Sequence, residues 1–165
     1  MLDVKEQYKK YPYPKPVDDL NEFFKTQRIV SCPSTDRGFY SAFPRQTKRP
    51  LKILIAGCGS YQAAAIALKN PESVVVGIDI SSTSLNHHES LRKKHNLTNL
   101  EVHERSIMDL ETWTEKFDLI ISTGVLHHLA DPLAGLKALK RRLLPNGAVH
   151  LMLYGPTLRT GVYWV

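Results

Sequence analysis

The sequence predicts an α/β fold, a three-layer sandwich in which helices cover both faces of a parallel sheet. Short apolar runs alternate along the chain with stretches of helical pattern. Such runs are typical of strands buried on both faces, and strands that alternate with helices form right-handed parallel units. The expected strands are residues 51–56, 74–79, 100–103, 117–122 and 148–154.

Capping residues and prolines separate these strands from the expected helices. Asn70 with Pro71 ends a first helix, Ser81 caps a second, and Asp131 with Pro132 starts the last. The expected helices are residues 62–69, 82–95, 111–114 and 132–144, and a turn follows at residues 145–147. Residues 1–50 form an N-terminal extension with one amphipathic helix at 18–26, and residues 51–165 form the domain.

The composition is that of one ordinary globular domain. Of 165 residues, 42% are hydrophobic and 23% are charged, and no apolar run approaches the ~18 residues of a membrane span. The N-terminus lacks the apolar stretch of a signal peptide, which predicts a cytoplasmic protein. Cys32 and Cys58 have neither metal nor redox spacing, so we expect reduced thiols and no metal site. The net charge is +6, but the basic runs carry no interleaved aromatics, so a solvated face is favoured over a nucleic-acid surface.

The ends of the first two strands carry the pattern of a nucleoside site. Gly57 and Gly59 allow a tight turn and let the backbone approach a ligand closely. Asp79 lies 20 residues after Gly59, where an acid accepts hydrogen bonds from the hydroxyls of a ribose. Capping of the next helix is the alternative role for Asp79, although Ser81 is better placed for it. Ligands of parallel sheets bind at these strand ends, so we expect the site there.

The loops after the third and fourth strands extend this site. Asp109 is placed to accept from an adenine amino group while Met108 covers a ring face. Capping of the short helix is an equal alternative for Asp109. Thr123 and Gly124 open the loop after the fourth strand, which faces the reaction site in a sheet of this kind.

The identity of residue 62 indicates which of two classes of adenosine cofactor the loop binds. A dinucleotide needs its pyrophosphate on the helix N-terminus and a third glycine for close helix packing. Gln62 stands where that glycine is expected, and with Tyr61 it would crowd a pyrophosphate. A cofactor without phosphate is therefore favoured, and an NAD-dependent oxidoreductase is the alternative.

Four strings in order resemble a known family. They are IAGCGS at residues 55–60, VGIDIS at 76–81, FDLIISTGVLHHL at 117–129 and LLPNGA at 143–148. Together they resemble the class I, Rossmann-like S-adenosylmethionine-dependent methyltransferases over residues 51–154. The resemblance implies a transferase whose cofactor is S-adenosylmethionine. The residues expected to contact that cofactor are Ala56, Gly57, Cys58, Gly59, Tyr61, Gln62, Asp79, Ile80, Met108, Asp109, Thr123 and Gly124.

The sequence departs from this family's pattern in three places. Ile55 stands where the family usually has an acid, and Tyr61 stands where a third glycine often lies. The family sheet has seven strands and this sequence predicts five, so we expect a domain incomplete at its C-terminus, a piece of a longer methyltransferase. The edge formed by residues 149–153 would then be unpaired, which predicts self-association through that edge.

The resemblance also sets expectations about mechanism. Methyl transfer from a sulfonium requires in-line placement of the acceptor, and a general base helps where the acceptor carries a proton. His127 and His128 are the candidate bases, with packing at the helix entry as the alternative. The segment before the first strand often forms a lid in similar enzymes, so residues 11–14 are a candidate lid, and packing on the sheet edge is the alternative. The acceptor, a small molecule or a protein, is left open, as is a domain that binds cofactor or partner without turnover.

Overall fold

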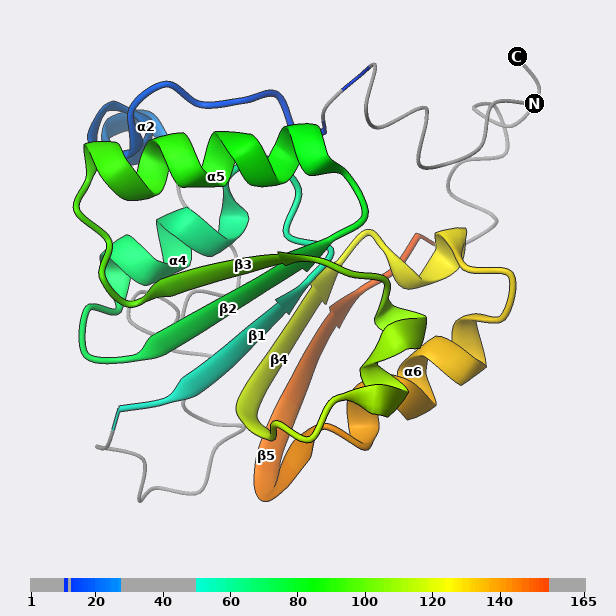
Figure 1. Ribbon diagram of the computed structural model, residues 1–165. Coiled ribbons are helices and arrows are strands. Elements are labelled where there is room, and N and C mark those ends of the chain that lie inside the picture. Colours follow the sequence, from blue (N-terminus) through cyan, green and yellow to red (C-terminus); the bar gives the residue numbers. More distant parts are fainter. Residues whose placement is uncertain (1–10, 12, 28–49, 155–165) are drawn as a thin grey trace.

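The computed structural model describes residues 11, 13–27 and 50–154, and its described residues form three layers (Figure 1). The central layer is a parallel sheet of five strands in the order β3-β2-β1-β4-β5. The strands are β1 (Lys52–Ala56), β2 (Val74–Asp79), β3 (Leu100–Glu104), β4 (Phe117–Thr123) and β5 (Leu143–Met152). The predicted α/β class is confirmed. The thiol state predicted for Cys32 falls outside the described residues.

Helices cover both faces of the sheet. The α2 (Leu20–Thr26), α4 (Gln62–Lys69) and α5 (Ser82–Lys94) helices lie on one face. The other face carries α6 (Pro132–Lys140) and the 3₁₀ helix η1 (Ile107–Thr112), while the 3₁₀ turn η2 (Leu126–His128) follows β4. No helix in the described part of the chain has the length and apolarity to cross a bilayer.

Alternating side chains of the central strand β1 divide the core in two. Ile53 and Ile55 are buried with residues of α4 and α5, whereas Leu54 and Ala56 are buried with residues of η1 and α6. This division follows from the period of two in a strand, which turns successive side chains to opposite faces. Because all five strands are parallel, the loops that follow them lie together at one edge of the sheet.

The end of α6 and the start of β5 differ from the prediction. The helix expected to continue through Leu144 ends at Lys140, and β5 begins at Leu143 rather than at 148. The reason is pairing across the sheet: Phe117 N–H donates to Arg142 O at 2.8 Å, and Leu143 pairs with Phe117. Residues 145–147 therefore lie within β5, where the register shifts, and do not form a separate turn before it.

Capping explains two smaller differences in helix bounds. The short helix expected at 111–114 lies at 107–112, because Ser106 and Asp109 form a capping box at its start. The helix expected from residue 18 begins at Leu20, because Asp19 Oδ1 accepts from the N–H groups of Asn21 and Glu22 at 2.8 and 3.3 Å. The β3 and β4 strands each run one residue beyond the predicted end.

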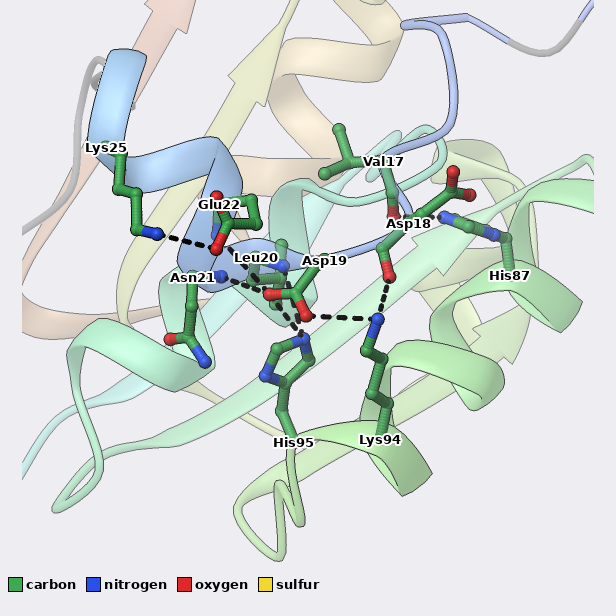
Figure 2. A network of polar contacts seen from close by, with 10 residues as sticks. All are labelled: Val17, Asp18, Asp19, Leu20, Asn21, Glu22, Lys25, His87, Lys94 and His95. Atoms are coloured by element: carbon green, nitrogen blue, oxygen red, sulfur yellow. Dashed lines mark hydrogen bonds and ion pairs between the residues drawn. The ribbon is translucent and has the colours of Figure 1, made fainter.

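A polar network joins the segment around α2 to the C-terminal end of α5 (Figure 2). Lys94 Nζ lies 3.0 Å from Asp19 Oδ2 and donates to the carbonyl of Asp18 at 2.8 Å. The Leu20 N–H donates to His95 Nε2 at 3.2 Å, and the Leu20 side chain is fully buried. The hydrogen bond from Lys94 lowers the pKa of Asp19. These contacts hold the start of α2 against the C-terminal end of α5.

We expect Asn99→Ala to lower the free energy of unfolding by about 1–3 kcal/mol, because it leaves three carbonyl groups without their shared donor. Asn99 Nδ2 lies 3.1, 3.0 and 2.9 Å from the carbonyl oxygens of Ala67, Asn70 and Ser73. Urea denaturation measures the loss. Asn86→Ala on the exposed face of α5 is the matched control, and equal losses in the two variants would contradict the assigned role.

Candidate functional site

A cavity of about 530 Å³ opens where the strands end and the strand order reverses, next to β1 and β4. Its size is that of a site for a small organic ligand. The described residues that line it come from the loops after β1, β2, β3 and β4, from β5, and from the segment around α2.

The loop after β1 is a turn that accepts only glycine at two positions. Gly57 and Gly59 have φ values of 77° and 55°, in the left-handed region. A Cβ at Gly57 would lie 2.3 Å from Val125 Cγ2, and a Cβ at Gly59 would lie 2.7 Å from Pro14 Cδ. Any larger residue would therefore be strained and would collide with a neighbour. The predicted tight turn is confirmed.

Asp79 connects this turn to the end of β2. Its Oδ2 accepts from Gly59 N–H at 2.8 Å, and its Oδ1 accepts from Ser81 N–H at 2.9 Å. Burial raises the pKa of the Asp79 carboxyl, against the effect of these backbone donors. The capping alternative for Asp79 is wrong, because Ser81 is the N-cap of α5 and its side chain accepts from Ser84 N–H. The Asp79 carboxylate lines the cavity, as the nucleoside prediction requires.

His88 supports the same turn from α5, and this role was not predicted from the sequence. Its ring is fully buried, and Nε2 lies 3.1 Å from Gly59 O. Because a carbonyl only accepts, Nε2 carries the proton and donates. Nδ1 is buried and has no hydrogen-bond partner among the described residues. A histidine inside a polar helix pattern gives no sequence signal of a contact 29 residues away.

Side chains fill the place at the start of α4 where a pyrophosphate would lie. Gln62 is the first residue of α4 and Tyr61 is its N-cap, and both line the cavity. Gln62 Nε2 donates to Thr123 Oγ1 at 3.4 Å, and the Tyr61 ring lies 5.0 Å from the ring of Phe23. Burial raises the pKa of the Tyr61 phenol. The arrangement disfavours a dinucleotide, as the sequence predicts.

Most of the predicted cofactor residues lie together in the cavity wall. They are Gly57, Cys58, Gly59, Tyr61, Gln62, Asp79, Ile80, Thr123 and Gly124. Three predicted residues do not line the cavity: Ala56, which is the last residue of β1, and Met108 and Asp109, which lie in η1 after β3. Ala56 is fully buried in the core, and Met108 is 42% exposed on η1. Asp109 Oδ2 accepts from Ser106 N–H at 3.0 Å, which is the capping alternative.

The two histidines after β4 have different surroundings. His128 lines the cavity, and partial burial lowers the pKa of its ring, so the imidazole is neutral at neutral pH. His127 does not line the cavity; its ring packs 4.7 Å from the ring of Tyr154 and 4.2 Å from that of His128. His128 is therefore the one of the pair that faces the cavity.

About half of the wall residues were not predicted from the sequence. The missed residues are Phe23, Ser84, Arg105, Ser106, Ile107, Val125, Leu129, Ala130, Met152 and Tyr154. Arg105 and Ser106 directly follow β3, so the strand-end rule could have found them. Phe23 comes from α2 and had no local signal.

Part of the predicted lid does lie at the cavity. Tyr13 and Pro14 line it, and Ser60 Oγ donates to Pro14 O at 2.5 Å. This contact joins the N-terminal segment to the glycine turn. Closure of the segment over a ligand stays a prediction.

These features define the class to which the protein belongs. A parallel sheet with a glycine turn after β1 and an acid after β2 is the Rossmann-like arrangement that binds nucleoside cofactors at the reversal of strand order. A family model described as "Methyltransferase domain" matches residues 48–154. The chain belongs to this family, and the resemblance to class I methyltransferases is confirmed.

Relatives and solved structures agree with this membership. The uncharacterized methyltransferase C1B3.06c of Schizosaccharomyces pombe is 34% identical over 148 residues, which is 82% of this chain and 52% of that protein. The N-terminal domain of EvdMO1 with SAH bound is 27% identical at a TM-score of 0.58, covering 70% of this chain and 46% of that one. The plantazolicin methyltransferase BpumL in complex with SAH has the same fold at a TM-score of 0.62 and 20% identity, covering 77% and 48%. The chain spans 26% to 52% of the length of four curated relatives it matches.

We expect the folded chain to lose stability on acidification through His88. Burial lowers the pKa of His88 to about 4 from 6.5. As pH falls below 6.5, His88 becomes protonated in the unfolded chain, whereas in the folded chain it stays neutral down to about pH 4. This difference in proton binding lowers the free energy of unfolding by roughly 3 kcal/mol across that pH range. Urea denaturation at neutral and mildly acidic pH measures this loss.

His88→Leu should flatten the pH dependence, and the exposed His103→Gln is its control. If the His88 variant keeps the full pH dependence of the parent, the assignment is wrong.

Proposed function

We propose that this chain binds S-adenosylmethionine in the cavity and forms the cofactor-binding part of a methyltransferase. The observation that carries the proposal is the Asp79 carboxylate, which is fixed by Gly59 and Ser81 and lines the cavity beside the glycine turn. The family membership of residues 48–154 and the SAH in the solved structures of EvdMO1 and BpumL support it.

The residues present fit such a cofactor. Asp79 would accept hydrogen bonds from the ribose hydroxyls, and the left-handed backbone of Gly57 and Gly59 forms the tight turn that lies beside this carboxylate. Tyr61 and Gln62 occupy the place of a pyrophosphate, which a cofactor without phosphate does not need. When bound, S-adenosylmethionine supplies an electrophilic methyl group, so the chain's own task is placement of the acceptor.

His128 is the proposed general base for an acceptor that carries a proton. Its neutral ring lines the cavity, and its lowered pKa keeps it able to accept a proton at a lower pH than an ordinary histidine. Phe23 and Tyr61 pack against each other at the cavity and would exclude water from the reacting groups. We propose a small molecule or a protein as the acceptor, and a labelled methyl donor in cell extract would identify it.

We expect calorimetry to detect binding of S-adenosylmethionine and of S-adenosylhomocysteine but not of NAD. Asp79→Ala should weaken that binding by about 1–3 kcal/mol, because the ribose loses a buried charged acceptor. Asp109→Ala is the matched control, since Asp109 lies outside the cavity wall, and it should bind as the parent does. Binding of NAD in place of the adenosyl compounds would refute the proposal, and binding without turnover in the extract assay would favour a non-catalytic domain.

We also propose self-association through β5. Among the described strands, β5 pairs only with β4 and forms one edge of the sheet. An open edge presents N–H and C=O groups to a second chain. Light scattering over a wide concentration range should show a mass that rises with concentration, and a constant monomer mass would exclude this association.

A further inference from the structure

The charged side chains of the cavity wall are confined to one end. Asp79 ends β2 and Arg105 directly follows β3, and the other described residues of the wall carry no carboxylate, ammonium or guanidinium group. Both oxygens of Asp79 accept backbone N–H groups. The guanidinium carbon of Arg105 lies 5.0 Å from the centre of the Trp113 ring, and Nη1 donates to Thr112 Oγ1 at 3.5 Å. Both charges therefore lie on the side of the cavity where β2 and β3 end.

The opposite side of the cavity, the β4–β5 end, lies where those two strands finish and has a largely apolar wall. Gly124 N–H donates to Met152 O at 2.9 Å, and a Cβ at Gly124 would lie 3.6 Å from Met152 Cε and 3.8 Å from Tyr154 Oη. The side chains of Met152 and Tyr154 thus lie next to the loop after β4. That loop adds Val125 and Leu129 to the wall. A ligand at this end finds apolar contacts and no ionic partner among the described residues.

Neutral polar groups complete the β4–β5 end. Gln62 Nε2 donates to Thr123 Oγ1 at 3.4 Å, so these two side chains are bonded to each other. His128 lies in η2, lines the cavity and is neutral at neutral pH, because partial burial lowers its pKa. A neutral imidazole accepts a hydrogen bond from a hydroxyl group and can take up its proton. A hydroxyl placed here would therefore meet a base, whereas a charged group would meet no counter-ion in the described wall.

This distribution of charge disfavours a protein or a nucleic acid as the methyl acceptor. Nucleophilic side chains of a protein surface such as lysine and glutamate are charged at neutral pH, and a charge removed from water needs an opposite charge. A nucleic acid carries its phosphates to cationic surfaces. The described part of the β4–β5 end supplies neither partner. An uncharged molecule avoids this cost and gains free energy by burying apolar area.

On the basis of the function proposed above, we propose that the acceptor is an uncharged, apolar small molecule that presents a hydroxyl group to His128, and that Met152 helps to select it. The hydroxyl oxygen bonds to the transferred methyl carbon, and the carbon–sulfur bond breaks with its electron pair left on sulfur. The hydroxyl proton passes to the His128 imidazole. The apolar part of the acceptor packs against Met152, Leu129 and Tyr154.

Calorimetry on the chain saturated with S-adenosylhomocysteine tests this class with three phenols of similar size. 4-Butylphenol is neutral, 3-(4-hydroxyphenyl)propylamine is a cation and 3-(4-hydroxyphenyl)propanoate is an anion. The neutral phenol should bind about tenfold or more tightly than either charged one, because each charge would lose water without gaining a partner. Equal affinities, tighter binding of a charged phenol, or binding of none of the three to a chain that binds S-adenosylhomocysteine would overturn the inference.

Variants that add a charge to the wall sharpen the test. Met152→Lys should weaken binding of 4-butylphenol and strengthen binding of the propanoate about tenfold, through a charge-assisted hydrogen bond. Ala130→Lys makes the same test at an exposed residue of the wall, where a lysine does not disturb the core. Leu133→Lys is the matched control, since Leu133 is 58% exposed and outside the wall, and it should leave the order of the three phenols unchanged. An equal effect of the control, or no effect of either wall variant, would overturn the inference.

The labelled methyl donor in cell extract separates this inference from the function on which it rests. The label should appear in uncharged small molecules. Label in protein or nucleic acid would overturn the inference and would still support methyl transfer. A parent chain that does not bind S-adenosylhomocysteine would refute the proposed function itself.

Discussion

The site depends on one constraint: the turn after β1 must pass within hydrogen-bond distance of the end of β2. The N–H groups of Gly57 and Cys58 both donate to Ile78 O, at 2.8 and 3.0 Å, and the next donor, Gly59 N–H, is taken by Asp79. Three successive backbone donors are thus satisfied by two residues of β2. The same contacts that close the turn fix the carboxylate, so the loop geometry and the acid cannot be varied independently.

Close packing on every side of the turn makes this arrangement rigid. Val125 follows β4, Pro14 belongs to the N-terminal segment and His88 belongs to α5, and each contacts one of the two glycines. Because interiors of this density tolerate little added volume, the turn cannot move to admit a side chain. The polar groups that face the cavity are therefore placed by neighbours from four separate elements rather than by the loop alone.

The parts that the sequence predicted well are those fixed by local rules. The bounds of β2 and α4, the caps at Ser81 and Asp131, and the glycine–acid pair all follow from periodicity, capping and spacing over about 20 residues. Local caps account for the small shifts in the bounds of η1 and α2. The larger errors arose where contacts distant in sequence decide the structure. The chain after α6 joins β4 at Leu143, against the helical pattern that runs to Leu144, and Phe23 reaches the cavity only because α2 docks on α5.

This division has a consequence for how the cavity can vary. The residues proposed to bind the cofactor lie between Gly57 and Thr123, in the glycine turn and at the ends of β2 and β4 beside it. The rest of the wall includes Phe23 from α2 and Met152 with Tyr154 at the end of β5, which share none of the hydrogen bonds that close the turn. Substitutions there can reshape the space for an acceptor while Asp79 and the glycine turn keep their geometry. Under the proposed function, the fold thus separates the turn and acid that would bind the cofactor from the wall residues that would select an acceptor.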